Sequence, residues 1–355
     1  MSLIFLLRWM ILTIKLGGWI FKVLRIRIVI CSLVVCVFWS TITLATDYYV
    51  SPTGTETWPN CTAQSNPCRA SNTDKAFLGA AAGDTVYFLD GEYSGLTVPY
   101  AIYIKTPVWY ASNSGTAENP ITFKALNRRQ VILEGLGNAT KPISNEIIPL
   151  IGCQEGSGDN YVVWDGFVLK AVRSDGTTPA MARASMYACN HVTVNDCEII
   201  GVEHSNGGAE NWDGVRFEGS DHITVTNCDI HGFKETSHNH NTSALKTYSS
   251  YYAKIHHNNF YDNYTHIYIK GSGNGNFDIG YNSFYSGDGG ILNPANSGNE
   301  PNHTYHNNLF VNIKESITDG GGSGYVQNDL IIRNNTFFNT VGGLLFVTQT
   351  WIDAG

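Results

Sequence analysis

Three short segments carry the residues with the clearest capacity for acid–base chemistry: VRFEG, ALKTY and YIKGS. Apolar and charged residues alternate in them, which predicts that Glu218, Lys246 and Lys270 point outward, one above another, from three stacked strands. Two lysines about 5 Å apart lower each other's pKa, because their like charges repel. One lysine can then accept a proton while the other pairs with an anionic group of a substrate. Arg216 lies beside this column, and Asn293 continues it. Glu218 would adjust the pKa values of the lysines.

The same column has a purely structural interpretation. Exposed Lys and Glu side chains on neighbouring strands often form a solvated charge ladder that adds little stability. The sequence alone leaves both interpretations open for Lys246 and Lys270.

A second set of candidate residues lies in the loop GGAENWDG, just before the first of these segments. Glu210 and Asp213 suit Ca²⁺ binding, or the acid and base of a glycoside hydrolase with Trp212 stacking on a sugar ring. The rings of Tyr248 and Tyr268 lie along the same coils and suit sugar binding as well. Plainer roles are open for both sets, because acids in glycine-rich loops form turns and tyrosines pack well on strands.

The elements that must position these residues repeat along the chain. Seven segments align without gaps: VWDGFV, VNDCEI, VTNCDI, IHHNNF, IGYNSF, YHNNLF and IRNNTF. They follow one another at offsets of 31, 31, 30, 24, 26 and 27 residues, and a second short strand precedes each by about ten residues. No stretch between them suits a crossover helix. The pattern predicts a parallel solenoid with coils about 4.8 Å apart. An up-and-down β-sandwich fits less well, because its strands would recur about every 8 to 12 residues.

One position of the repeat has a distinctive composition. The fourth residue of the aligned segments reads Gly166, Cys197, Cys228, Asn258, Asn282, Asn308 and Asn335. Stacked coils turn such a position into a row, and buried asparagines in a row bond to one another from coil to coil. We therefore expect an asparagine ladder inside the solenoid.

Six cysteines follow residue 45, and their even number permits disulfides in an exported chain. Cys61 and Cys68 flank a polar loop and form the best-supported pair. Cys197 and Cys228 share a register in adjacent coils, and Cys153 and Cys189 do so in the preceding strand. Adjacent coils allow a disulfide at such positions, and they equally allow stacked buried thiols. Both outcomes stay open.

The first 45 residues have the layout of a secretory signal. They contain five basic residues and no acidic one, then the apolar run IVICSLVVCVFW and the small residues of STITLA. Cleavage is expected after Ala45, with an uncleaved anchor or an upstream false start as alternatives. Removing five of the 22 basic residues leaves 17 against 30 acidic ones, a net charge of −13.

The composition excludes several classes of protein. Charged residues make up 15% of the chain, against about 25% in ordinary soluble domains, and aromatic residues make up 12%. Low charge with many aromatics is not typical of disorder. The 36 glycines and many asparagines disfavour a helical bundle. An acidic balance argues against nucleic-acid binding driven by charge.

From Asp47 onward the sequence resembles the secreted right-handed parallel β-helix proteins of the pectate-lyase-like superfamily. The resemblance rests on five stretches: YYVSPTG, SNTDKAFLGAAAGD, DTVYFLDGEY, NPITFKA and VILEG. It implies an all-β, right-handed parallel β-helix solenoid with a short N-terminal capping helix. The expected organisation is a signal over 1–45, an entry and capping segment over 46–83 and the β-helix over 84–355. No C-terminal cap is expected after the last strand of the sequence.

The lysine column is similar to the site of the chondroitinase-B and alginate-lyase family of polysaccharide lyases. Such enzymes remove the proton next to a uronate carboxylate and neutralise the charge that develops there. The resemblance implies that Lys246 matches the family's lysine and that Lys270 stands where the family has arginine, although lysine lacks the planar fork. Ser237–Asn241 offers His and Asn in place of the family's calcium-binding carboxylates. Ca²⁺ stays a candidate cofactor, with Glu210 and Asp213 as its ligands.

We therefore expect an exported protein, extracellular or periplasmic, that cleaves uronate-containing glycans by β-elimination. Its expected partner is an acidic polysaccharide and not a nucleic acid. A membrane is expected only if the first segment stays uncleaved, and the chain is expected to be a monomer. Two alternatives stay open: a glycoside hydrolase or uronan epimerase using Glu210, Asp213 or Glu218, and a non-catalytic carbohydrate-binding solenoid.

Overall fold

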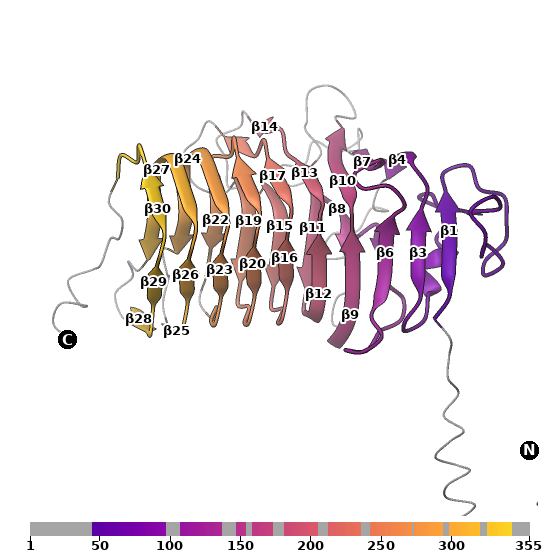
Figure 1. The fold of residues 1–355 in the computed structure, drawn as a ribbon, viewed down its shortest axis with the longest axis horizontal. Helices are drawn as coiled ribbons and strands as arrows, with labels where there is room; N and C mark the ends of the chain where they lie inside the picture. The colour runs from indigo at the N-terminus through magenta and orange to yellow at the C-terminus, as the bar shows by residue number, and fades with distance from the viewer. Residues whose placement is uncertain are drawn as a thin grey trace, which may run out of the picture. The chain divides into compact units, whose positions relative to one another are not determined.

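The computed structural model describes residues 45–342 except 97–106, 137–146, 154–157, 173–180, 205–211, 236–241, 272, 294–297 and 320–324 (Figure 1). Residues 1–44 of the expected signal lie outside the described residues. Residues 343–355, where the sequence suggested a missing C-terminal cap, also lie outside them. Within the described residues, no helix is both long enough and apolar enough to cross a membrane.

Parallel strands stack into a first sheet of 11 strands, one from each coil along most of its length. In spatial order the strands are β2 (Cys68–Arg69), β1 (Asp47–Ser51), β3 (Thr85–Phe88), β6 (Ile121–Ala125), β9 (Gly158–Asp165), β12 (Cys189–Asn195), β16 (Thr224–Thr226), β20 (Lys254–His256), β23 (Asp278–Gly280), β26 (Thr304–His306) and β29 (Ile331–Arg333). Figure 1 shows these strands side by side, as stacking of successive coils requires.

A second sheet of 15 strands has two arms that meet at long strands. One arm holds β4 (Gly91–Leu96), β7 (Val131–Leu136), β10 (Phe167–Val172), β13 (Glu198–Ile200), β17 (Asp229–His231) and β21 (Asn259–Tyr261). The other arm holds β5 (Trp109–Tyr110), β8 (Ile147–Gly152), β11 (Met181–Tyr187), β15 (Trp212–Glu218), β19 (Thr242–Tyr248) and β22 (Thr265–Ile269). The long strands are β24 (Ser283–Asn293), which pairs with both arms, and β27 (Leu309–Asp319), which pairs with β24 and β30 (Thr336–Phe338).

Each coil therefore contributes three strands, one more than the minimum that the sequence repeat required. The aligned segments of the repeat run from the first sheet into the first arm, and the preceding short strands form the second arm. Two small parallel pairs lie outside these sheets: β14 (Glu203–His204) with β18 (Lys234–Glu235), and β25 (Gly298–Pro301) with β28 (Tyr325–Asn328). All registered pairs in the two large sheets are parallel, so the expected all-β parallel solenoid is confirmed.

The core is a continuous column of apolar side chains between the sheets. Strands β12, β16 and β20 of the first sheet alternate, so that Val194, Val225 and Ile255 are buried and their neighbours face outward. Stacked aromatic rings extend the column, for example Phe260, Phe284, Phe310 and Phe337, whose centroids lie 4.8–5.1 Å apart. Such burial is the main favourable contribution to folding.

A row of amides runs through the core at the repeat's fourth position. The side-chain Nδ2 of Asn258 donates to Oδ1 of Asn282 at 3.0 Å, and Asn282 and Asn308 continue the row to Asn335. Each Nδ2 also donates to a backbone carbonyl, such as that of Val225 at 2.9 Å. The buried amides are thereby satisfied, as burial of polar groups requires.

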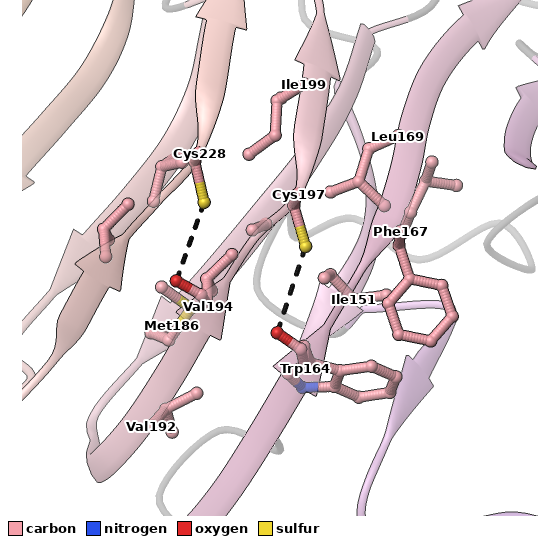
Figure 2. Packing of buried hydrophobic residues seen from close by; sticks show 14 of the residues in the cluster. Ile151, Trp164, Phe167, Leu169, Met186, Val192, Val194, Cys197, Ile199 and Cys228 are labelled. Carbon is pink, nitrogen blue, oxygen red and sulfur yellow. Dashed lines mark hydrogen bonds between the residues drawn. The ribbon is translucent and has the colours of Figure 1, made fainter. Parts of the chain in front are cut away.

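Two cysteines occupy the same row one and two coils earlier. Cys197 and Cys228 are free and buried, and Figure 2 shows their thiols directed at backbone carbonyls of Trp164 and Val194. The backbone N–H of Cys228 donates to Oδ1 of Asn258 at 2.9 Å, so thiols and amides form one row. Burial raises the pKa of the Cys197 thiol, which keeps it protonated and unreactive.

The other four cysteines of the described residues form two disulfides, Cys61–Cys68 and Cys153–Cys189. The two alternatives that the sequence left open are thus both realised, a disulfide in one pair of coils and stacked thiols in the other. The expectation that Cys153 and Cys189 share a register is wrong, because Cys189 pairs with Gly158 in the first sheet whereas Cys153 directly follows β8 of the second sheet.

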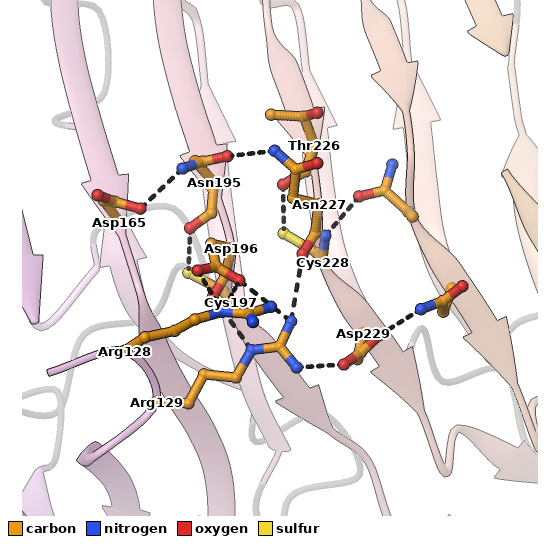
Figure 3. A network of polar contacts seen from close by, with 12 residues as sticks. Arg128, Arg129, Asp165, Asn195, Asp196, Cys197, Thr226, Asn227, Cys228 and Asp229 are labelled. Atoms are coloured by element: carbon orange, nitrogen blue, oxygen red, sulfur yellow. Dashed lines mark hydrogen bonds and ion pairs between the residues drawn. The ribbon is translucent and has the colours of Figure 1, made fainter. Parts of the chain in front are cut away.

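Ion pairs on the outside of the first arm join coils that are far apart in sequence. Arg129 bonds both Asp196 and Asp229 and also donates to the backbone carbonyl of Asn227 at 3.2 Å (Figure 3). Nearby, the side chain of Asn195 donates to Asp165 at 2.7 Å and accepts from Asn227 at 2.9 Å. These bridges clamp successive turns of the solenoid.

The expected N-terminal capping helix is a single 3-10 turn, η1 (Ala76–Gly79). The preceding residues close a turn in which the backbone N–H of Asp74 donates to Oγ of Ser71 at 3.0 Å. The turn inserts the ring of Phe77 among the first coils, with centroids 5.4 Å from those of Phe88 and Trp109. The N-terminal end of the core is therefore covered by one aromatic side chain on a short turn.

Candidate functional site

The register of β15, β19 and β22 differs from the column expected from sequence. Arg216 pairs with Lys246, and Lys246 pairs with Tyr268. Lys270 follows Ile269, which pairs with Thr247, so Lys270 does not stack directly on Lys246. The predicted alignment of Glu218, Lys246 and Lys270 is therefore wrong by two residues at each step.

The inward apolar row explains the shift. One buried row runs from strand to strand: Val215 pairs with Leu245, Leu245 with Ile267, and Ile267 with Ile291. All four side chains are fully buried. A slip of two residues keeps every side chain on its own face, so alternation of apolar and polar residues does not reveal it. Asn293 also leaves the column, because Leu292 is the residue that pairs with Tyr268, and Asn293 is itself buried.

Lys246 lies at the centre of the resulting cluster and is not exposed. Its side chain and that of Asp213 are both completely buried, and Lys246 Nζ lies 2.8 Å from Asp213 Oδ1. Ser243 donates to the same carboxylate oxygen at 3.4 Å. Asp213 belongs to β15, which pairs with β19, so the sheet itself brings these groups together. A buried charge of this kind is stable only with such a partner.

Arg216 extends the cluster towards solvent. Its Nη1 lies 3.1 Å from Asp213 Oδ2, and its Nη2 lies 2.8 Å from Glu218 Oε2. The guanidinium therefore bridges the buried carboxylate and the partly exposed one. Its fork geometry suits two carboxylates at once.

The two lysines have lowered pKa values. Burial lowers the pKa of Lys246 to about 8, with the charges of Lys270 and Arg216 acting in the same direction and Asp213 opposing them. Burial also lowers the pKa of Lys270, with Arg216 adding to the effect and Asp213 opposing it. The sequence had attributed the lowered pKa to mutual repulsion alone, whereas desolvation is the larger cause.

Two tyrosine rings complete the surface of the cluster. The Arg216 guanidinium lies 4.5 Å from the centroid of Tyr248. Lys270 Nζ lies 5.8 Å from the Tyr248 centroid and 5.7 Å from that of Tyr268, so the lysine sits between the two rings. Lys246 Nζ lies 5.5 Å from the Tyr268 centroid. Cations within about 6 Å of such rings are attracted by their faces.

An open groove lies beside Tyr264, and none of its lining residues belongs to the cluster. It is lined in part by Glu203, Glu235, Asp262, Tyr264 and Asp288, with Lys234 beside them. Tyr264 directly precedes β22, and the charge of Glu235 helps burial to raise the pKa of Tyr268 on the same strand. The sequence did not single out the acidic residues of this groove, because they come from several coils and share no motif.

The other sequence-based candidates divide between described and undescribed residues. Glu210 and Ser237–Asn241 lie outside the described residues. Trp212 begins β15, and its side chain is likewise not described. Calcium does not fit Asp213, because Lys246 and Arg216 bond its two oxygens from the positions that a cation would need.

Comparison with known proteins supports the fold. The family model described as "Right handed beta helix region" matches residues 184–351. A search of curated proteins finds no match to the sequence.

Several solved structures are similar to this chain. Pectate lyase Pel9A is 13% identical with a TM-score of 0.46, over 81% of this chain and 80% of that one. An alginate lyase from Paenibacillus sp. str. FPU-7 is 17% identical with a TM-score of 0.41, over 78% and 98%. A family 28 exopolygalacturonase from Yersinia enterocolitica is 14% identical with a TM-score of 0.43, over 74% and 61%. The stacked three-strand coils show that the chain folds as a parallel β-helix, and its residues 184–351 match the family of right-handed β-helix regions.

Proposed function

We propose that this protein is a polysaccharide lyase that binds uronate-containing glycans at the cluster on β15, β19 and β22. The observation that carries the proposal is the pair of lysines with lowered pKa values beside an arginine and two tyrosine rings. A β-elimination needs a neutral base and a positive charge, and this cluster offers both at one place.

Lys270 is the base in this proposal. It is the lysine with exposed surface, whereas Lys246 is completely buried and bonded to Asp213. Neutral Lys270 takes the proton next to the uronate carboxylate. The electron pair of that C–H bond forms a carbon–carbon double bond, and the glycosidic oxygen on the neighbouring carbon leaves with the electron pair of its C–O bond and takes up a proton from water.

Arg216 and Lys246 supply the positive charge in the same proposal. The guanidinium stabilises the negative charge that develops on the uronate carboxylate. It lies near the surface, where it bonds to the partly exposed carboxylate of Glu218. Lys246 acts as a positioning residue, since its ion pair with Asp213 fixes the neighbouring strands and adds positive potential. Tyr248 and Tyr268 hold sugar rings beside Lys270. No step of this proposal uses a metal.

The direct test is formation of an unsaturated uronate, which absorbs in the ultraviolet because its double bond is conjugated with the carboxylate. The purified protein is incubated with pectate, alginate and chondroitin, and the product is followed with time. We expect Lys270→Ala to lower kcat by about 10²–10⁴-fold, the usual contribution of a general base. Lys254→Ala, an exposed lysine on the first sheet, is the matched control and should leave kcat unchanged.

Other outcomes separate the alternatives. Cleavage without an unsaturated product would identify a hydrolase and overturn the elimination. Retention on an immobilised uronan without any cleavage would identify a carbohydrate-binding solenoid. Full activity of Lys270→Ala on any of these glycans would remove the assigned base.

Export through residues 1–45 forms part of the same proposal, because large acidic glycans lie outside the cell. N-terminal sequencing of the protein recovered from the extracellular or periplasmic fraction should begin at Thr46. A protein that keeps its first residues and sediments with membranes would show an uncleaved anchor instead.

A further inference from the structure

The outward face of the first sheet carries a cluster of two histidines and one carboxylate that the proposed glycan site does not use. His256 ends β20, Asp278 begins β23 and His306 ends β26. β23 lies between the other two strands, so the three residues come from three consecutive coils. Their inward neighbours Ile255 and Tyr305 are buried, which places the cluster on the outside of the sheet.

The two histidines share a register with a glycine between them. His256 pairs with Gly280, and Gly280 pairs with His306. Strands two steps apart in a sheet are separated by about 9.6 Å, yet the imidazole centroids lie only 5.7 Å apart. The rings approach because position 280 has no side chain. A Cβ there would lie 2.5 Å from Cε1 and Nε2 of His306, so the imidazole takes the space that any other residue would fill.

The ligand atoms of the cluster converge on one point. His306 Nε2 lies 2.8 Å from Asp278 Oδ1, and His256 Nε2 lies 3.2 Å from Asp278 Oδ2. All three groups offer ligand atoms within 4.8 Å of one another. A tetrahedral zinc ion with bonds of about 2.0–2.1 Å holds its ligands about 3.3 Å apart, close to these separations.

The surroundings of the cluster also suit a metal. Nε2 of His256 is buried and makes no hydrogen bond within the described residues, although it lies at ion-pair distance from Asp278. Nδ1 of His306 contacts the side-chain amide of Asn307 at 2.8 Å, which orients the ring with Nε2 towards the carboxylate. Metal-bound histidines are usually held in this way through their other nitrogen. Asp278 is 39% exposed, so an ion can enter from solvent.

We propose that His256, Asp278 and His306 bind a zinc-type divalent cation that links three consecutive coils. Two imidazoles and one carboxylate suit zinc and its transition-metal neighbours, whereas calcium prefers oxygen ligands alone. The ion joins β20, β23 and β26 across the face of the first sheet, and its free energy of binding adds to the stability of the folded coils. The site is independent of the proposed glycan cleavage, because it lies on a different sheet from Lys270.

The test uses the full chain without a histidine tag, freed of metal with a chelator and titrated with zinc in a calorimeter. We expect saturable binding and a zinc-dependent rise in Tm. His306→Gln and Gly280→Ala should each weaken zinc affinity by about 100-fold or more, the first by removing a ligand and the second by filling the space it occupies. His257→Gln is the matched control, since His257 stacks on Tyr281 beside the cluster and is not part of it.

Asp278→Asn keeps the proposal testable if the buried variants fold poorly, because its side chain is partly exposed. It should lower zinc affinity while the Tm measured without metal stays near that of the parent. With cobalt in place of zinc, the parent and His257→Gln should give the visible spectrum of a tetrahedral site, and Asp278→Asn should not. Equal zinc affinity in the parent, His306→Gln and Asp278→Asn would overturn the proposal, as would an equal loss in His257→Gln.

Discussion

Replacing Asp213 with Asn tests the electrostatic account of the buried cluster. In the parent, the pKa of Lys246 is lowered from 10.5 to about 8. One pKa unit corresponds to about 1.4 kcal/mol, so keeping this lysine charged opposes folding by roughly 3 kcal/mol even with Asp213 present. Without the carboxylate the pKa falls further, and at pH 7 the lysine gives up its proton once the pKa is below 7. That limits the opposing free energy to roughly 5 kcal/mol.

The lysine therefore contributes roughly 1–2 kcal/mol of destabilisation to Asp213→Asn at pH 7. Arg216 and Ser243 also lose their bonds to the carboxylate, which adds about 1–3 kcal/mol. We expect a total loss of about 2–5 kcal/mol in the free energy of unfolding, comparable to breaking other buried ion pairs.

The pH dependence separates the two contributions. Because the pKa of Lys246 is lower in the folded state, the unfolded chain binds more protons between about pH 8 and pH 10.5. The stability of the parent contributed by this lysine rises with pH through that window. At pH 10 the lysine is neutral in the folded parent and in the folded variant, so only the part due to Arg216 and Ser243 remains. The effect of Asp213→Asn should shrink by roughly 1–2 kcal/mol between pH 7 and pH 10.

The assay is equilibrium unfolding in urea at both pH values, followed by tryptophan fluorescence. Glu134→Gln is the matched control, because it removes a carboxylate from the Lys170–Glu134 pair, whose lysine is 46% exposed. Exposed pairs of this kind contribute about 0–1 kcal/mol. An Asp213→Asn variant no less stable than Glu134→Gln at pH 7 would refute the reasoning. A loss of equal size at pH 7 and pH 10 would refute the role of the Lys246 charge.

Three further predictions concern other parts of the molecule. Asn282→Ala should lower the free energy of unfolding in urea by about 3 kcal/mol or more, because the side chain of Asn258 and the backbone carbonyl of Ile255 lose buried hydrogen-bond partners. Asn339→Ala is the control and should have little effect, because its hydrogen bond to Asn312 is exposed. Phe77→Ala should cost about 3–5 kcal/mol and expose the first coils to limited proteolysis; an unchanged cleavage pattern would contradict its capping role. Below about pH 8, where Lys246 keeps its charge, the lyase rate should rise with pH as Lys270 loses its proton; a rate that falls with rising pH in this range would contradict a lysine base.

The sequence repeat by itself determined most of the architecture. Offsets of 24 to 31 residues, short strands and turns rich in Gly and Asn admit few folds other than a parallel solenoid. The fourth position of the repeat also placed Cys197, Cys228 and the asparagines in one buried row. Periodicity carries this information because stacking makes equivalent positions neighbours.

The same alignment contained the signal for the histidine cluster. Its second position reads His256, Gly280 and His306 in three successive segments. The sequence analysis did not single out this glycine, and the structure shows that it makes room for an imidazole. Gly280 matters because it leaves space for the ring of His306, and that becomes visible only when the position of the ring is known.

The glycan site shows the limit of sequence more clearly. Sequence identified Arg216, Lys246 and Lys270 on one face, because alternation of apolar and polar residues fixes the face of a strand. It did not fix their register, since a slip of two residues preserves that alternation, and the inward packing of Val215 and Leu245 decided it. Burial of Lys246 and its bond to Asp213 likewise depend on which strands become neighbours. The sequence by itself therefore determined the solenoid and the faces of its strands, and the tertiary structure decided which charges meet and how far water is excluded from them.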